Sequence, residues 1–401
     1  MDEGAKTGKK TGVWIITSAH SCEDGRLYYK EGLSLKKAGY DLTITVPGDR
    51  TEKIITDDKI KVIKIKRNKG LIGRIRFNLS LLRTAFNADY MVSHCVEPDT
   101  LFIGILLKIL QRKKIVYDCH EHTPSFIAVN RKFPRPFRRF FAALVWLIER
   151  MLIIPVDEII DTNETRAARF MRVKPKHTTV VSNMPNVEYI QNVMRCSTKE
   201  KSETKNDFVI VSTGDFNKNR GFHIIVEAIR LLRERYPARC FRFVGIGRLD
   251  EREQELKSWS DDFLQRHNLK ENIEITGWLP YDEMYEKVAC ADVGIIMFQP
   301  DSYNHFSGLP NKLFDFMCVG IPVVASDLPE IRNVVSSAGC GLLVDPKNSS
   351  SVADVIYQLS MEADLQREMG ERGRSAVLNK YNWEQMEKRL LCVYERLFER
   401  E

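Results

Sequence analysis

The sequence predicts an α/β protein of two doubly wound domains, each with a parallel sheet covered by helices. Three observations lead to this fold class. Short apolar runs rich in β-branched residues alternate with stretches that have the apolar spacing of helices. The alternation occurs twice, in halves of similar size that a polar stretch separates. The length of 401 residues suits two or three domains of ~150 residues each.

The first half begins the alternation close to its amino terminus. We expect strands at residues 13–17, 41–46, 60–65, 90–93 and 115–117. Helical spacing is found at 28–37 and 101–108. Strands joined through helices pair in parallel, so their carboxyl ends meet at one edge of the sheet.

The second half repeats this arrangement without a close repeat of the sequence itself. We expect strands at 208–212, 241–244, 273–276, 293–297, 322–325 and 341–344, and a helix at 222–233. Residues 187–207 are polar, which is typical of an exposed linker. The predicted domains are therefore 1–195 and 206–375. Loops at the carboxyl ends of both sheets are expected to line a cleft between the domains.

Composition excludes several classes of protein. The chain is 43% apolar and 29% charged, which is ordinary for a soluble protein and excludes disorder and low complexity. A net charge of +7 permits acidic ligands, but no nucleic-acid-binding motif accompanies it. Nine scattered cysteines without a C-x-x-C pair predict reduced thiols and no zinc ribbon. Residues 1–11 lack the apolar region of a signal peptide, so we expect a cytoplasmic protein.

The loop after the first strand of the second half has the features of an anion site. It runs from Ser212 to Gly221, carries Gly214, and leads into the expected helix. The amino terminus of a helix attracts anions through its N–H groups and its dipole. Lys218 and Arg220 add cationic donors suited to phosphate. Alternatively, such a loop is a solvated turn.

A second segment, at 305–317, predicts a pyrophosphate site. Gly308 permits a close backbone approach, and Pro310 fits the first turn of a helix. The amides expected to face the ligand are those of Leu309, Asn311 and Lys312. Asp315 is one turn further on, where a carboxylate accepts bonds from ribose hydroxyls. Alternatively, Asp315 is a solvated residue on a core helix.

The first half offers polar side chains after its strands. Asp118, His120 and Glu121 follow the strand at 115–117, and we expect all three in a loop at the cleft. Histidine exchanges protons near neutral pH, although a lone histidine is more often structural. His94, after the strand at 90–93, is a further candidate. The segment with Asp24, Gly25 and Arg26 follows the first strand. The chain has neither a full G-x-G-x-x-G nor a G-x-x-x-x-G-K-[ST] motif, so nicotinamide-binding and ATPase functions are disfavoured.

These motifs together resemble those of the retaining GT-B glycosyltransferases of family 4 over nearly the whole chain. In the second half the similar segments are 213–214 with 220–221, 277–280, 307–315, 320–324, 326–330 and 341–346. In the first half, 24–26, 30–31, 38–40 and 117–121 resemble members that build surface polysaccharides. The segment 376–401 resembles the helix that, in this fold, crosses back to the first domain.

The resemblance implies roles for single residues. Arg220 matches the basic residue that holds the donor diphosphate, Asp315 the acid that holds the ribose, and His120 the histidine beside the transferred sugar. Two positions depart from the family pattern. Ser307 replaces the first acid of E-x7-E, and Asp215 replaces an arginine that often follows the loop glycine. We expect Ser307, which is short and neutral, to leave space near the sugar.

The resemblance implies a glycosyltransferase that binds a nucleotide diphosphate sugar mainly through its second domain. The acceptor is expected to be a glycan or a lipid-linked molecule, with His120, Arg220 and Asp118 near the reaction. Asp24, Gly25, Arg26, His94 and Glu121 are expected on the acceptor side. We find no convincing acidic pair for a metal and expect no cofactor. The alternatives are a sugar-nucleotide 2-epimerase of the same fold and a non-catalytic nucleotide-sugar-binding protein.

Two basic stretches suggest a membrane partner. Residues 61–76 hold seven basic side chains and no acid, and 131–139 hold five more among aromatic and proline residues. Basic and aromatic side chains together suit an anionic bilayer surface. A peripheral location on the inner face of a membrane is therefore one expectation, and a solvated face beside a core helix is the other.

Overall fold

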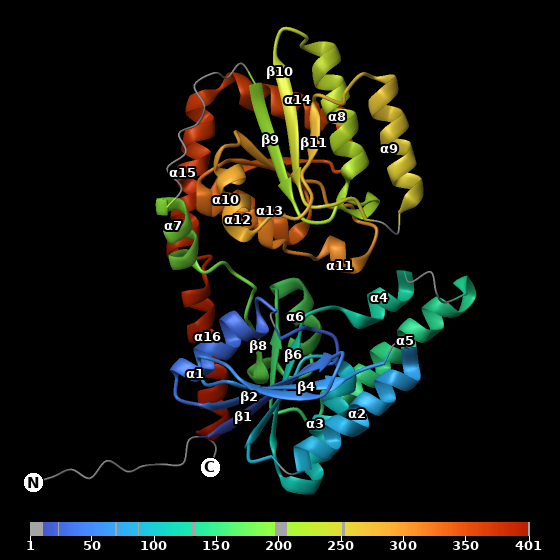
Figure 1. The fold of residues 1–401 in the computed structure, drawn as a ribbon, viewed down its shortest axis with the longest axis vertical. Helices are drawn as coiled ribbons and strands as arrows, with labels where there is room; N and C mark the ends of the chain where they lie inside the picture. The colour runs from blue at the N-terminus through green and yellow to red at the C-terminus, as the bar shows by residue number, and fades with distance from the viewer. Residues whose placement is uncertain are drawn as a thin grey trace, which may run out of the picture. The chain divides into compact units, whose positions relative to one another are not determined.

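The computed structural model describes residues 11–22, 24–68, 70–86, 88–129, 134–196, 207–250 and 253–399. Most of the polar start (1–11), most of the run 196–206 and part of the basic stretch 131–139 lie outside the described residues. The chain divides into two compact units. Unit 1 is Met1–Asn183 with Glu384–Glu401, and unit 2 is Met184–Trp383 (Figure 1).

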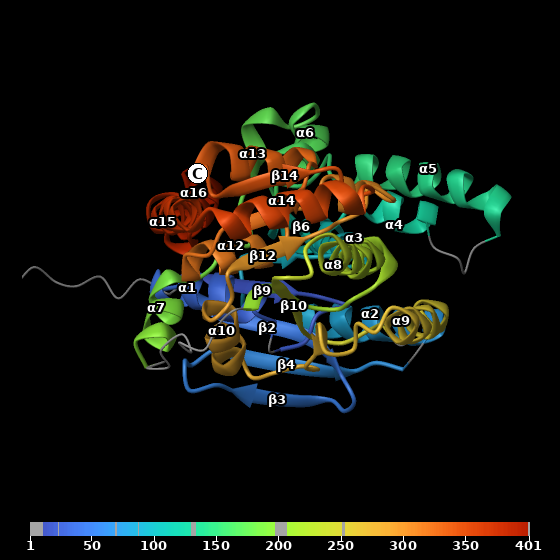
Figure 2. The ribbon, with the colours of Figure 1, turned by 90° about the horizontal axis from the view of Figure 1, so that it is seen from above.

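Unit 1 contains an eight-stranded sheet in the order β3-β4-β2-β1-β5-β6-β7-β8. Every neighbouring pair is parallel except β3 and β4. Figure 2 shows β3, β4 and β2 side by side. The strands are β1 (Gly12–Ile16), β2 (Asp41–Gly48), β3 (Glu52–Ile55), β4 (Lys61–Lys66), β5 (Val92–Cys95), β6 (Lys114–Cys119), β7 (Glu158–Asp161) and β8 (Thr178–Val180). The five strands expected in this half are confirmed, whereas the short β3, β7 and β8 were not predicted.

The helices of unit 1 begin with a wide turn. In the segment Leu27–Gly32 the Glu31 N–H donates to the carbonyl of Arg26, five residues earlier, and α1 (Leu33–Lys37) continues from it. Such π-type turns occur frequently at functional sites. The other helices are α2 (Gly70–Phe86), α3 (Pro98–Gln111), α4 (Thr123–Val129), α5 (Arg135–Leu152), α6 (Glu164–Met171) and α16 (Trp383–Phe398), with a short turn at Pro175–His177.

The core of unit 1 lies under α2, α3 and α6. Phe77 and Leu107 from the helices pack with Trp14 and Tyr117 from the sheet, and all four are fully buried. Apart from its first residue, α16 belongs to this unit, although it comes last in the chain. Its Arg396 guanidinium bonds with Glu158 of β7 at 2.7 Å, which ties the carboxyl end of the chain to the sheet.

Unit 2 contains a six-stranded, fully parallel sheet in the order β11-β10-β9-β12-β13-β14. The strands are β9 (Asp207–Thr213), β10 (Cys240–Ile246), β11 (Ile273–Ile275), β12 (Val293–Ile296), β13 (Val323–Ser326) and β14 (Gly341–Val344). The helices are α7 (Val187–Cys196), α8 (Phe222–Arg235), α9 (Gln254–Arg266), α10 (Tyr281–Ala289), α11 (Tyr303–Phe306), α12 (Asn311–Val319), α13 (Pro329–Ala338), α14 (Ser349–Met361) and α15 (Ala363–Asn379), with a short turn at Lys218–Arg220. All six strands expected in this half are confirmed.

The predicted linker at 187–207 was wrong in its first half. Residues Val187–Cys196 form α7, which packs against α10 and α12. Ile190 is 3% exposed there, and Val187, Ile190, Val193 and Met194 have the three-and-four spacing of an amphipathic helix.

Candidate functional site

The loop after β9 brings a glycine and an arginine together. Gly214 has φ +98°, a conformation that favours glycine, and its N–H donates to the carbonyl of Ile246 on β10. A Cβ at Gly214 would lie 3.0 Å from a terminal nitrogen of Arg220, so the guanidinium rests against the glycine. The same arginine also donates to the carbonyl of Asp215 at 3.3 Å. The carboxylate of Asp215 itself lies 3.5 Å from Arg248.

Gly221 fixes the entry into α8. Its φ is +71°, and a Cβ there would lie 2.1 Å from the carbonyl oxygen of Met297. Asn217 closes the preceding turn, because its side chain accepts a bond from the Arg220 N–H at 2.9 Å. The backbone on both sides of Arg220 is therefore fixed by the sequence. Lys218 is held differently, with its N–H bonded to Glu253 at 2.9 Å.

A second basic residue, Lys312, lies in the first turn of α12. The Lys312 ammonium donates to the Ser212 hydroxyl at 3.0 Å. Burial, together with the positive charge of Arg220, lowers the pKa of Lys312 to about 7, although the Asp315 carboxylate opposes the shift. Within the described residues, neither Lys312 nor Arg220 forms an ion pair with a carboxylate. Basic side chains without a carboxylate ion pair favour an anion as a bound partner.

Asp315 projects from the next turn of α12 and is partly exposed. Its carboxylate accepts a bond from the Tyr285 hydroxyl of α10 at 2.8 Å. Burial and the nearby Asp315 charge raise the pKa of Tyr285, so the phenol keeps its proton and orients the carboxylate. The arrangement suits a carboxylate that accepts bonds from ligand hydroxyls.

The segment before α12 differs from expectation in two details. Pro310 lies immediately before the helix and not in its first turn. Gly308 is needed by the protein itself, since a Cβ there would lie 2.6 Å from the carbonyl oxygen of Asn304. Ser307 is fully buried and its hydroxyl donates to the Tyr303 carbonyl at 2.6 Å, so it is bound within the protein, and the expected space near the sugar stays a prediction. Leu309 is partly exposed and Asn311 is exposed.

In unit 1 the described polar residues gather around Asp118. This residue lies on β6 and is fully buried, so the expectation that it belongs to the loop was wrong. Only His120 and Glu121 lie beyond the strand, and Glu121 is exposed. Asp118 tolerates burial because two cationic or polar partners offset the loss of hydration. Although burial opposes it, Arg26 and His120 hold the pKa of Asp118 well below its usual range.

The Asp118–His120 contact determines which histidine nitrogen is available. Nε2 of His120 lies 2.6 Å from the Asp118 carboxylate. A carboxylate only accepts, so Nε2 carries the proton of this bond and Nδ1 of the neutral ring is an acceptor. Burial lowers the pKa of His120 although Asp118 opposes the shift, so the ring is neutral near pH 7. The His120 ring packs edge-on against that of His20, with 5.1 Å between their centroids.

Arg26 is the centre of a buried ion-pair network. It donates to Asp118 at 3.1 Å and to the carbonyl of Val181 at 2.7 Å, and its Nε lies 2.7 Å from Glu31. The residue is 4% exposed, so it positions other groups and does not reach a ligand. Burial raises the pKa of Glu31 well above its usual range although Arg26 opposes it. Glu31 lies where the π-type turn meets the network.

His94 is part of the same network and lies on β5, not after it. It is fully buried, and its Nδ1 lies 2.7 Å from the hydroxyl of Tyr394 on α16. Its Nε2 lies 3.5 Å from Asp118 and 3.7 Å from Glu31. Contact of His94 with an acceptor is therefore excluded unless the core opens.

The segment at Asp24 caps the wide turn that carries Arg26. The Asp24 carboxylate accepts bonds from the N–H groups of Arg26 at 2.9 Å and Leu27 at 3.0 Å, and pairs with His20 at 3.0 Å. These bonds lower the pKa of Asp24 although burial opposes the shift. Gly25 is exposed, and a Cβ there would meet nothing within 4 Å, so no contact explains this glycine.

Three buried side chains of unit 1 could in principle hold a cation. Glu31, His94 and Asp118 offer ligand atoms that lie within 4.8 Å of one another. However, Arg26 already pairs with both carboxylates, and a divalent ion would sit beside its fixed guanidinium. The donor set fits a closed ion-pair network better than a metal centre.

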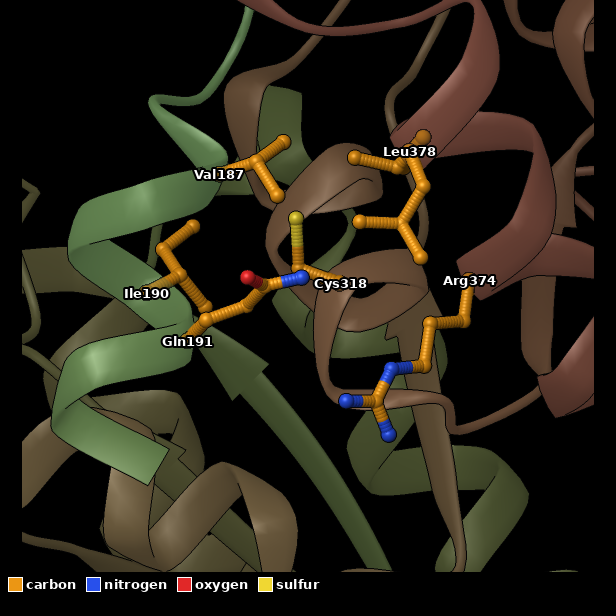
Figure 3. A pocket seen from close by; sticks show the side chains of 7 residues that line it. Val187, Ile190, Gln191, Cys318, Arg374 and Leu378 are labelled. Carbon is orange, nitrogen blue, oxygen red and sulfur yellow. The ribbon is translucent and has the colours of Figure 1, made fainter. Parts of the chain in front are cut away.

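A small cavity in unit 2 lies away from these residues. Figure 3 shows it between α7, α12 and α15. Its walls are mainly apolar side chains, with Gln191 and Arg374 as polar neighbours. It marks imperfect packing of α7 and offers no convergent polar groups for a ligand.

Sequence reasoning missed four residues that position these sites. They are Glu31 and Tyr394 in unit 1, and Ser212 and Tyr285 in unit 2. Glu31 was within reach of sequence analysis, because an acid five residues after Arg26 in an apolar helix needs a cationic partner. Tyr394 and Tyr285 lie 300 and 30 residues from their partners and carried no local signal.

Two Rossmann-like units of this kind define the GT-B class of fold, and solved structures of that class match the chain over nearly its full length. Sucrose-phosphate synthase from Thermosynechococcus elongatus superposes with a TM-score of 0.76 at 16% identity, over 98% of this chain and 100% of that one. Anabaena HepE, solved in complex with UDP, gives a TM-score of 0.71 at 13% identity, over 96% of this chain and 100% of that one. These identities establish the fold alone.

Family models identify the chain more closely. Residues 207–362 match the family described as glycosyl transferases group 1, and residues 25–189 match glycosyltransferase family 4. The two ranges together cover well over half of the chain, which therefore belongs to the group 1, family 4 glycosyltransferases.

Curated relatives are distant. The colanic acid biosynthesis glycosyltransferase WcaL of Escherichia coli is 25% identical over 47% of this chain and 45% of its own length. The glycosyltransferase EpsD of Bacillus subtilis is 22% identical over 86% of both chains. The match to the first of these relatives thus spans less than half of that protein.

Proposed function

We propose that this chain is a retaining glycosyltransferase. It moves a hexose-type sugar from a nucleoside diphosphate sugar to a hydroxyl of a glycan or of a lipid-linked acceptor. The product belongs to a surface polysaccharide or a related glycoconjugate. Family membership supports the reaction class, and a relative named for colanic acid biosynthesis supports the type of product.

The observation that carries the proposal concerns two basic residues of unit 2. Arg220 and Lys312 form no ion pair with a carboxylate within the described residues, and the amino terminus of α12 begins next to Lys312. A diphosphate leaving group gains negative charge as the sugar departs. Fixed positive groups and helix N–H donors stabilise that charge without reorganising. Asp315, oriented by Tyr285, receives the ribose hydroxyls.

Unit 1 supplies the second half of the chemistry. Nδ1 of His120 accepts a bond from a hydroxyl of the reacting sugar, because Asp118 holds the opposite ring nitrogen as a donor. No side chain is assigned as a covalent nucleophile. We propose same-face attack, in which the leaving phosphate takes the acceptor proton and configuration is retained. The donor and the two protein units suffice, without a metal or a cofactor.

We place the protein in the cytoplasm, at times on the inner face of a membrane. Within the described residues, no helix has the length and the apolar character needed to cross a bilayer. A lipid-linked acceptor gives the protein a reason to bind the membrane surface.

The test begins with protection against thermal unfolding by a panel of UDP, GDP, ADP and dTDP sugars, because any ligand of the native state raises its stability. The best donor is then incubated with membrane extracts that contain polysaccharide acceptors. We expect release of nucleoside diphosphate only when acceptor is present. The new linkage should have the same anomeric configuration as the sugar in the donor, and activity should be unchanged in EDTA. Interconversion of C2 epimers without acceptor indicates an epimerase, and protection without release indicates a binding protein. Either result contradicts the proposal.

A further inference from the structure

Helix α5 turns an apolar stripe away from the core. Seven of its residues follow the three-and-four spacing of an amphipathic helix, yet their exposure ranges from 37% to 64%: Phe137, Phe140, Phe141, Leu144, Leu147, Ile148 and Met151. A stripe with this spacing normally packs against the protein. Figure 1 shows α5 at the edge of unit 1, with α4 beside it.

The orientation of α5 is fixed from its other side. Glu149 is 3% exposed, accepts a bond from the Tyr117 hydroxyl at 3.1 Å, and lies 3.5 Å from Arg169. Turning the apolar stripe inward would pull this carboxylate out of its buried partners. The exposure of the stripe is therefore a built feature of the fold.

The two neighbouring helices have the same character. α3 packs against both α2 and α5. The inner sides of α2 and α3 contribute Phe77 and Leu107 to the core of unit 1. Their outer sides carry exposed apolar residues at helical spacing: Ile72, Ile75, Leu79 and Phe86 on α2, and Phe102 and Ile109 on α3. We call these six residues and the seven of α5 the outer apolar face.

The charges around the outer apolar face are almost all positive. Exposed arginines are Arg76 and Arg83 on α2, and Arg139 and Arg150 on α5. The acids within α2, α3 and α5 are Asp99 and Glu149. Asp99 is bound by Arg74 at 2.5 Å, and Glu149 is the buried anchor of α5. No acid in these three helices is left to repel an anionic surface.

We propose that the outer apolar face binds the surface of an anionic lipid bilayer, with α5 lying in the boundary between headgroups and acyl chains. A membrane supplies both an apolar layer for the stripe and negative headgroups for the arginines. A second copy of the chain would supply more arginines, because a symmetric pairing brings the same surface to itself. The inference gives the peripheral location of the proposed function a specific surface.

This surface overlaps only part of the basic stretches seen in the sequence: Ile72, Ile75 and Arg76 belong to 61–76, and Phe137 and Arg139 belong to 131–139. Lys61 and Lys64 lie on β4, outside the outer apolar face, and pair with Asp41 and Glu52 at 2.8 Å. Their charge is already compensated within the protein. The membrane contact is thus assigned to α2, α3 and α5.

Flotation of the full chain with vesicles tests the assignment. Vesicles of phosphatidylcholine alone are compared with vesicles that contain 30% phosphatidylglycerol, at low and high salt. We expect strong flotation with the anionic vesicles at low salt. Phe140→Ser/Leu147→Ser/Met151→Ser should lower partitioning about tenfold for each serine. Arg139→Gln/Arg150→Gln should lower it about fivefold for each arginine, on anionic vesicles only.

The control variant changes exposed apolar residues elsewhere. Ile54→Ser/Ile55→Ser/Met361→Ser alters β3 and the end of α14, and should float like the wild type. Equal loss in the control, or no flotation of the wild type, overturns the proposal. The proposal is also overturned if light scattering shows a stable dimer of the wild type and a monomer of the triple α5 variant. Protection against thermal unfolding by nucleotide sugars is measured on every sample. Flotation of the wild type without protection by any nucleotide sugar refutes the proposed function but supports the membrane assignment. Protection without flotation refutes the membrane assignment and leaves the proposed function standing.

Discussion

The two units use arginine in opposite ways. Arg26 of unit 1 is 4% exposed and pairs with Glu31 and Asp118. Arg220 of unit 2 rests on a glycine and, like Lys312, forms no ion pair with a carboxylate among the described residues. A buried charge with its counter-ions in place maintains structure. A charge that the protein leaves uncompensated indicates what the site binds.

Removing Arg26 should have the largest effect. Arg26→Met leaves two buried carboxylates without their cation, and we expect the free energy of unfolding to fall by about 3–5 kcal/mol. Urea unfolding with hydrogen exchange on unit 1 peptides measures this change. The same substitution in unit 2, Arg220→Met, should alter the stability by no more than about 0.5 kcal/mol. Equal losses in both variants would erase the distinction between the two arginines.

Removing the His120 side chain should have the second-largest effect, on turnover. His120→Ala removes the Nδ1 acceptor, and we expect kcat to fall about a hundredfold while the affinity for nucleoside diphosphate is unchanged. The control is His267→Ala, at the exposed end of α9. A variant that turns over normally would make His120 a structural partner of Asp118 only.

Arg220 should affect affinity more than stability. Arg220→Ala removes a charge-assisted hydrogen bond of about 1.5–3 kcal/mol, so calorimetry should show nucleoside diphosphate binding weakened about tenfold to a hundredfold. Arg230→Ala on α8 is the matched control, because Arg230 already pairs with Glu227 and Glu234. Unchanged affinity in Arg220→Ala would exclude this residue from the donor site.

Lys312 should give the smallest effect, a dependence on pH. Its pKa is lowered to about 7 in the free protein, and a bound diphosphate should raise it again. Binding is then at full strength below pH 7 and weakens as the pH rises from 7 to 9, by less than tenfold per unit, with proton uptake from the buffer. Calorimetry in buffers of different ionisation enthalpy measures this uptake. Binding to the Lys312→Gln variant should depend on pH only through the ionisation of the ligand itself. A wild type that binds equally well at pH 7 and pH 9 contradicts the assignment.

Local patterns were sufficient for most of the architecture. Apolar runs fixed the parallel strands, because a strand buried on both faces has to be apolar throughout. The loop with Gly214 and Gly221 could also be predicted from the sequence, since positive φ angles favour glycine at those positions. The segment Val187–Cys196 was predicted to be a linker because of the polar run that follows it, although Val187, Ile190, Val193 and Met194 have the spacing of an amphipathic helix.

The sequence by itself determined the two-sheet fold, the family, and the residue types around the candidate site. Only the tertiary structure decided the state of each side chain. Asp118 became a buried strand residue because Arg26, 92 residues away, compensates its charge. His94 became inaccessible because Tyr394 closes over it from the far end of the chain. Ser307 turned inward to a carbonyl, and the apolar stripe of α5 turned outward. Burial and pairing depend on residues distant in the sequence, so no local pattern contains them.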